Sequence, residues 1–205
     1  MIRRLLAVIV ILPVATLCGC RSLALLLPEQ TRTVAAEYPY LAGRSVAVVV
    51  RAADELLFEY PHVQWEIADH VRVALEGNVR GIKVISPRRV VDFQRSEPAW
   101  QTMDPAVLGR RFQAERLLEI ELTQYTTREP DSPHLYRGHI QAAVRVYNTE
   151  YTDSQPAYHA DVETAFPPDG PGRWGTDDRT IRAATMEAFA SELAGKFYDR
   201  KVKVR

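Results

Sequence analysis

Cys18 and Cys20 are the only cysteines in the 205-residue chain, and their spacing raises the question of metal or redox chemistry. A thiolate metal site usually needs three or four converging ligands, and the chain has no later cysteine to complete one. Two cysteines separated by one residue cannot easily form an unstrained disulfide. We therefore expect neither a bound metal nor another cofactor.

The five histidines do not form a metal-binding pattern either. His62 and His70 are eight residues apart on or near one helix, too far to share a metal by themselves. His139 and His159 fall on neighbouring strands, but the expected turn pairs His139 close to Ala165. At about 3.4 Å per residue, the two imidazoles then lie well over roughly 10 Å apart. We expect them to be solvated surface residues.

Charged residues on the expected strands could be read as acid and base groups. Arg145, Asp161 and Glu163 lie on the polar face of two adjacent strands, and Glu119 and Glu121 oppose basic residues in the same way. Cross-strand ion pairs on a solvated sheet face explain this pattern without catalysis. The chain also lacks the linear signatures GxSxG, P-loop, HExxH and GxGxxG.

The segment before the cysteines has the features of a secretory signal. Arg3 and Arg4 precede an almost wholly apolar run over residues 5–17, followed by small residues. The run is shorter than the roughly 20 residues that cross a bilayer, and Pro13 interrupts it. An uncleaved anchor is the alternative.

The end of this segment resembles the lipobox of bacterial lipoproteins, with Leu17, Cys18, Gly19 and Cys20 in its four places. The resemblance implies that residues 1–19 are removed and that Cys20 becomes a lipidated N-terminus bearing palmitate or a similar acyl chain. The mature protein would then have no free thiol. Arg21 rather than Asp after the cysteine implies the outer membrane of a Gram-negative envelope, facing the periplasm.

The charge balance argues against nucleic-acid binding. The chain has 26 basic and 26 acidic residues, and loss of Arg3 and Arg4 leaves 24 against 26. A nucleic-acid-binding domain would show a basic excess. The remaining length, about 186 residues, suits one domain with extensions.

We expect a tether over residues 20–43 and a single domain over residues 44–205. The tether is not of the flexible Gly/Ser type. The apolar run Leu23–Leu27 would be poorly solvated in water, and it either rests on the lipid surface or packs on the domain. The sequence leaves this choice open.

Hydrophobic periodicity outlines the domain. A β-branched run predicts a strand buried on both faces, three- and four-residue spacing predicts amphipathic helices, and strict alternation predicts three antiparallel strands with one polar face. Ser86-Pro87 and Asp104-Pro105 each place a capping oxygen before a proline at the first helical position. The expected order is strand 45–50, helix 61–78, strand 81–86, two short helices, strands 116–125, 136–148 and 157–166, and a final helix after Asp177.

The final helix follows a loop rich in proline and glycine over residues 167–175. Asp177 and Asp178 suit its N-terminus, and we expect its buried stripe to contain Met186, Phe189, Leu193 and Phe197, with Lys196, Arg200 and Lys201 at its C-terminus. Trp174 lies within the loop beside Arg173. Its indole either plugs the end of the core or, with Arg173, forms a docking tip.

This layout resembles the domain shared by the TolB amino-terminal region, CsgG and LpoB. In that family a short helix ends in LGxxxGAD and runs directly into an alternating strand. Leu108, Gly109, Phe112, Ala114 and Leu118 match, whereas Gln113 replaces Gly and Glu115 replaces Asp. The resemblance covers residues 44–200. It implies an α+β fold with one mixed sheet of about five strands and helices packed on one face, the last three strands being antiparallel.

The resemblance also implies an envelope protein that works by contact, since the family has no common catalytic residues. We expect a non-catalytic, lipid-anchored protein that docks an envelope partner in assembly, transport or cell-wall synthesis. Assembly into a homo-oligomer is raised by the family alone. The alternative is an envelope hydrolase or polysaccharide-processing enzyme that uses acidic residues on the sheet face, because many carboxylate sites have no linear motif.

Overall fold

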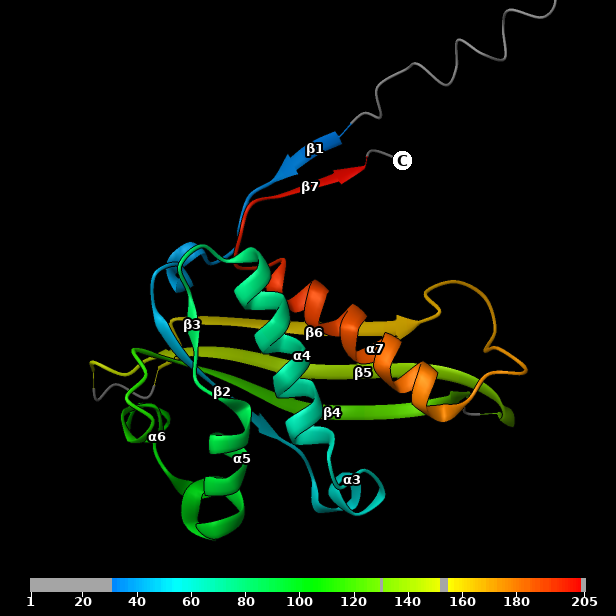
Figure 1. The fold of residues 1–205 in the computed structure, drawn as a ribbon, viewed down its shortest axis with the longest axis horizontal. Helices are drawn as coiled ribbons and strands as arrows, with labels where there is room; N and C mark the ends of the chain where they lie inside the picture. Colours follow the sequence, from blue (N-terminus) through cyan, green and yellow to red (C-terminus); the bar gives the residue numbers. More distant parts are fainter. Residues whose placement is uncertain (1–30, 130, 152–154, 204–205) are drawn as a thin grey trace, which may run out of the picture. The chain divides into compact units, whose positions relative to one another are not determined.

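The computed structural model describes residues 31–129, 131–151 and 155–203, which form two units (Figure 1). The larger unit runs from Ala35 to Arg200. The smaller one contains the strand β1 (Thr31–Val34) and most of β7 (Arg200–Lys203), which pair as a two-stranded sheet. No helix among these residues is long and apolar enough to cross a bilayer.

A mixed five-stranded sheet is the centre of the larger unit. Its spatial order is β3 (Lys83–Val84), β2 (Ser45–Arg51), β4 (Arg116–Glu129), β5 (Ser132–Asn148) and β6 (Tyr158–Phe166). β2 is parallel to β3 and β4, whereas β4, β5 and β6 are antiparallel. The predicted α+β class, mixed sheet and antiparallel final strands are confirmed.

Parallel neighbours require long connections, and helices supply them. α3 (Asp54–Glu59) and α4 (Val63–Asn78) connect β2 to β3. The 3-10 helix η2 (Pro39–Leu41) precedes β2. The predicted helix over residues 61–78 is confirmed as α4, but the sequence did not predict α3.

The connection from β3 to β4 consists of α5 (Pro87–Ser96), the 3-10 helix η3 (Pro98–Thr102) and α6 (Pro105–Arg111). Asp104 caps α6 as expected, because its carboxylate accepts from the backbone N–H groups of Ala106 and Val107. Ser86 precedes Pro87 at the start of α5, but its hydroxyl makes no capping bond.

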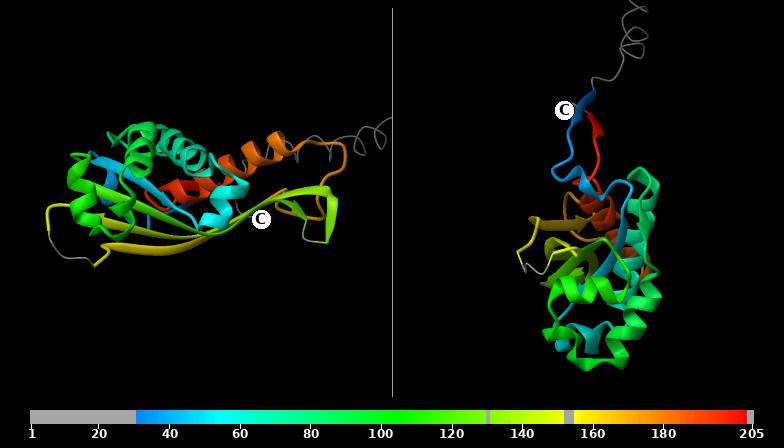
Figure 2. Two further views of the ribbon diagram at one scale, coloured as in Figure 1. Left: turned by 90° about the horizontal axis from the view of Figure 1, so that it is seen from below. Right: turned by 90° about the vertical axis from the view of Figure 1, so that its left-hand side faces the viewer.

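The main core lies between one face of the sheet and two helices, α4 and α7 (Asp178–Ala194), which Figure 2 shows on the same side of the strands. The four residues expected in the buried stripe of the last helix all lie in this core. They are Met186, Phe189, Leu193 and Phe197. Asp177 and Asp178 lie at the start of α7 as expected, and Asp177 also caps the helix by accepting from the backbone N–H of Thr180.

A second core covers part of the opposite sheet face. Ala47 and Val49 alternate along β2 with residues of the main core, so their side chains point to the other side. They pack with Val90 of α5, Trp100 of η3 and Leu108 of α6, among others. The prediction that β2 is buried on both faces is therefore confirmed, whereas the expectation of a solvated face is wrong at the first part of β4.

The C-terminus of α7 differs from the prediction. The helix ends at Ala194, and its last turn contains no basic residue. Lys196 lies beyond the helix and places its ammonium 3.0 Å from the carboxylate of Glu37, while Arg200 begins β7. Lys196 therefore contacts the N-terminal segment and Arg200 belongs to β7, so neither residue lies in the last turn of the helix.

That N-terminal segment packs on the larger unit ahead of residue 44, the boundary that the sequence indicates. Tyr38 and Leu41 are buried in the main core. The backbone N–H of Tyr38 donates to the carbonyl of Lys196 at 3.0 Å, and Tyr158 donates to Glu37. Residues 1–30, with Leu23–Leu27 and the lipobox, lie outside the described part of the chain.

The two departures from the LGxxxGAD motif, Gln113 and Glu115, lie at the junction between α6 and β4. Gln113 has a φ of 59°, in the left-handed region that favours glycine, which is the residue of the resembled motif. The Glu115 carboxylate accepts from the backbone N–H of Ser45 at 2.9 Å and pairs with Arg44 at 2.6 Å. Glu115 thus joins the start of β4 to the start of β2.

Acidification is expected to weaken this junction. The hydrogen bond from the Ser45 backbone, followed by the contact with Arg44, lowers the pKa of Glu115 from 4.5 to about 2. The stabilisation is therefore complete above pH 4.5 and is lost as the pH falls towards 2. Because the side chain is 39% exposed, we expect its contribution to be only about 1 kcal/mol.

Urea unfolding at a series of pH values, with wild type and Glu115→Gln side by side, measures this effect. The difference in free energy of unfolding between the two proteins should shrink as the pH falls from 4.5 to 2. A difference that stays constant over that range would contradict the role assigned to the carboxylate.

Candidate functional site

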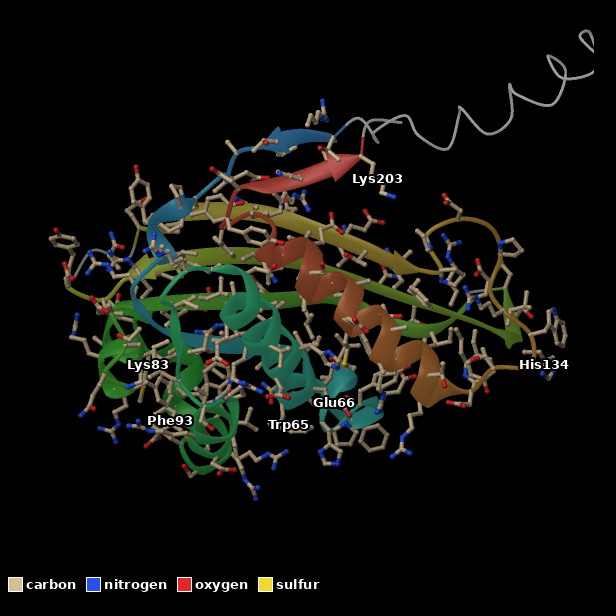
Figure 3. All side chains as sticks on the ribbon, turned by 45° about the horizontal axis from the view of Figure 1, so that its top comes forward. Trp65, Glu66, Lys83, Phe93, His134 and Lys203 are labelled. Carbon is tan, nitrogen blue, oxygen red and sulfur yellow. The ribbon has the colours of Figure 1, made fainter. Side chains whose placement is uncertain are left out.

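The loop between β6 and α7 presents an aromatic residue to solvent at one end of the sheet. Trp174 is 72% exposed, so the interpretation of its indole as a plug of the core is wrong. The indole stacks on the exposed imidazole of His134, with ring centroids 6.1 Å apart and an interplanar angle of 20°. Figure 3 shows His134 at the outer end of the molecule.

The backbone beside Trp174 is held against β5. The N–H of Tyr136 donates to the carbonyl of Arg173 at 3.2 Å, and the N–H of Arg173 donates to the carbonyl of Tyr136 at 2.9 Å. Gly172 permits this approach, because a Cβ there would lie 3.0 Å from the Tyr136 carbonyl oxygen. The loop is therefore joined to the sheet directly before the exposed indole.

Two arginine–aromatic contacts lie beside the backbone bridge between Arg173 and Tyr136 and order the rest of this surface. The guanidinium of Arg173 lies 5.4 Å from the centre of the Phe166 ring, and that of Arg128 lies 4.8 Å from the centre of the Tyr136 ring. We call the exposed surface of His134, Arg173 and Trp174 the tryptophan tip. An indole beside an exposed guanidinium can bury apolar area and donate hydrogen bonds to a partner.

The polar face of the sheet does not bring the expected acid and base groups together. Arg145 contacts β4, where its guanidinium lies 2.8 Å from Glu121 and 3.5 Å from Glu119, and not Asp161 or Glu163 as expected. The register is the reason, because Arg145 opposes Glu119 on one side and His159 on the other.

The carboxylates of β6 are exposed and make separate contacts. Glu163 pairs with His139 at 2.9 Å, and Asp161 lies 3.9 Å from His159. Their side chains are 66% and 79% exposed. His139 pairs with Ala165 in the sheet, so the predicted register that separates the two histidines is confirmed. Within the described ranges, no three His, Cys, Asp or Glu side chains are grouped to hold a metal.

Glu119 is the main correction to the polar face. We expected a solvated ion pair, but its side chain is only 5% exposed. Arg51 donates to one carboxylate oxygen, while Arg145 and the Tyr147 hydroxyl contact the other at 3.5 and 3.4 Å. The second core, which the alternation did not reveal, covers this end of the face.

A cleft of about 440 Å³ adjoins this network at the C-terminal end of β2. Arg51 stacks over Trp100 at 4.7 Å and donates to the carbonyl of Gln101, so the guanidinium joins β2 to η3. Glu121, which also lines the cleft, is held by Arg145. Beside the cleft, ion pairs of Arg51 and Arg145 with Glu119 and Glu121 connect β2, β4 and β5, and Arg51 alone also contacts η3. The alternation predicted that Glu119 and Glu121 face basic residues of the next strand, but it did not predict the contacts of Arg51 with Glu119 and η3, because these come from separate segments.

Comparison with known proteins gives structural likenesses only. No family model and no curated protein matches the chain. Among solved structures, the PelC dodecamer from Paraburkholderia phytofirmans is 8% identical with a TM-score of 0.45, covering 80% of this chain and 96% of that one. Lipoprotein GNA1162 from Neisseria meningitidis is 15% identical with a TM-score of 0.45, covering 74% and 98%.

The C-terminal domain of LpoB from Salmonella enterica is also similar, at 11% identity and a TM-score of 0.37, covering 60% of this chain and 82% of that one. Bacterial lipoproteins, including the LpoB whose family the sequence motif resembles, are thus among the structures to which this chain is similar. All three TM-scores lie below 0.5, and these likenesses carry no argument about function.

Proposed function

We propose that this chain is a lipid-anchored protein of the bacterial cell envelope that acts by docking a protein partner and catalyses no reaction. The tryptophan tip is the proposed docking site. The observation that carries this proposal is an indole 72% exposed on a backbone that is hydrogen-bonded to the sheet.

Two physical arguments support the tip as a docking site. Tryptophan and arginine are enriched among the few residues that dominate interface energies, and Trp174 lies directly after Arg173. Binding also costs less when the contacting groups are already held in place. The backbone bonds between Arg173 and Tyr136 and the stacking on His134 hold Trp174 in place before a partner binds.

Replacing Trp174 with Ala is expected to abolish partner capture without lowering stability. The indole is exposed, so the free energy of unfolding should change by no more than about 0.5 kcal/mol. Tyr151→Ala is the matched control, because Tyr151 is 62% exposed and follows the opposite end of β5. Crosslinking in the native envelope, followed by mass spectrometry, should show one partner lost with the first variant and retained with the second.

Two outcomes would count against the tip. Capture that is unchanged in Trp174→Ala would place the docking surface elsewhere. A loss of about 3–5 kcal/mol of stability would indicate that the indole supports the core instead.

The lipid anchor is proposed from the spacing of Leu17, Cys18, Gly19 and Cys20 behind a short apolar run. Burial of acyl chains contributes about 0.8 kcal/mol per CH₂, and two or more chains give stable anchoring. We propose that the protein faces the periplasm from the outer membrane, on the basis of Arg21.

Mass spectrometry of the mature protein is expected to find Cys20 as an acylated N-terminal residue. Cys20→Ser should release the chain from the membrane fraction without changing its fold, whereas Cys18→Ser should leave anchoring intact. An unmodified Cys20, or a chain that retains Met1, would disprove the anchor.

A further inference from the structure

The helix α3 exposes an apolar side chain among carboxylates. Phe58 is 91% exposed, while Leu56 and Leu57 pack against the main core. Asp54 and Glu55 precede Phe58 by four and three residues, so they lie on the same side of the helix. Neither carboxylate forms an ion pair with another described residue.

A groove that contains two arginines and an aromatic side chain lies between α4 and α5. It has a volume of about 220 Å³ and is lined by His62, Trp65, Arg88, Val91, Asp92 and Arg95. Trp65 is 43% exposed, and Figure 3 shows it on the outer side of the molecule. Within the described part of the chain, the arginines Arg88 and Arg95 have no ion-pair partner.

We propose that two copies of this chain pair through this surface. Phe58 of one copy enters the groove beside Trp65 of the other, and the carboxylates of α3 meet the arginines of α5. We call this the α3–α5 surface. It is separate from the tryptophan tip and does not depend on the proposed function.

Complementarity within one chain favours a second copy as the occupant. The apolar side chain and the groove come from consecutive helices, and His62 of the groove is four residues from Phe58. Adjacent complementary patches suit a two-fold interface, in which each contact occurs twice. A soluble polyanion would match the arginines but would be repelled by Asp54 and Glu55 and would leave Phe58 exposed.

Truncation of Phe58 tests the apolar part of the contact. Sedimentation of the full mature chain in detergent should show a concentration-dependent dimer for wild type. Phe58→Ala should raise the dissociation constant at least about tenfold, as expected for an aromatic anchor. Val73→Ala is the control, because Val73 is a 56% exposed residue of α4 outside the groove, and it should leave the dimer unchanged.

Charge reversal tests the pairing itself. Asp54→Arg/Glu55→Arg and Arg88→Glu/Arg95→Glu should each sediment as monomers, because like charges then face each other in both contacts. An equimolar mixture of the two variants should dimerise again, since each contact then joins opposite charges. Glu187→Arg on the exposed face of α7 is the control for a change of charge alone and should dimerise as wild type does.

All variants share the same lipid and the same detergent, so differences between them report the protein surface. Thermal unfolding should confirm that each variant is folded. A wild-type chain that remains monomeric, or a mixture that fails to pair, overturns the proposal. Binding of polyglutamate to a monomeric wild type would show that the groove serves an anionic partner instead.

Discussion

Gly138→Ala is expected to lower the free energy of unfolding by about 3 kcal/mol, the upper part of the usual range for overpacking. Gly138 lies on β5 opposite Phe166 of β6. A Cβ built on it would be 1.7 Å from the hydroxyl oxygen of Thr185 on α7 and 2.6 Å from its Cβ. Thr185 is fully buried and its hydroxyl donates to the carbonyl of Ile181, so moving the side chain would break this bond and disturb the core.

A second substitution on α7 distinguishes this clash from other effects. Thr185→Gly removes all the Thr185 atoms that the new methyl group would meet, so it should recover part of the loss when combined with Gly138→Ala. Thr185→Ala should recover less, because it retains the Cβ. Gly77→Ala is the control, since a Cβ at Gly77 meets no atom within 4 Å. Chemical denaturation measures all four, and a Gly138→Ala protein as stable as wild type would show that α7 can shift.

Glu119→Gln is expected to cost about 3 kcal/mol of unfolding free energy, the lower end of the range for breaking a buried ion pair. The substitution leaves Arg51 and Arg145 beside a neutral group in a region where Glu119 itself is 5% exposed. The two guanidiniums are 22% and 29% exposed, and solvation of these groups limits the loss.

Glu121→Gln is the matched control for this prediction. Glu121 lies on the same strand and contacts the same Arg145, but its side chain is 46% exposed. A solvent-exposed pair contributes at most about 1 kcal/mol. Denaturant unfolding of both variants should therefore separate them by about 2 kcal/mol. Equal losses would mean that burial of Glu119 does not strengthen its ion pairs.

The periodic parts of the fold were predictable because their signals are local. Alternation along residues 158–162 placed Tyr158, Ala160 and Val162 towards the core, and the register that follows from the turn correctly separated His139 from His159. Spacing along α7 identified its buried stripe. A side chain's face follows from its position within a strand or helix, so no distant contact is needed to predict it.

The charged site was not predictable in the same way. Alternation assigns Glu119 to the face opposite Leu118, but it does not say what covers that face. Burial of Glu119 depends on the second core, formed with η3 and α6, and on Arg51 from β2. These partners lie in separate segments, so only the packed structure reveals that the carboxylate is enclosed.

Exposure of single aromatic residues was likewise decided by tertiary structure. The glycines and prolines of the loop predicted a surface crossing, but the indole of Trp174 could have folded inward or outward. The backbone bridge between Arg173 and Tyr136 holds the loop with that indole in solvent.

The sequence by itself determined the class of fold, the cap at Asp104, the acidic start of the last helix and the pattern that resembles a lipoprotein signal, because each depends on residues close together in the chain. The tertiary structure alone decided that the compact unit begins at Ala35, where Tyr38 bonds to Lys196 more than 150 residues later. It also decided that Phe58 and Trp174 remain in solvent and Glu119 does not. Burial is a property of the whole packed chain, and local periodicity reports only which side of an element a residue occupies.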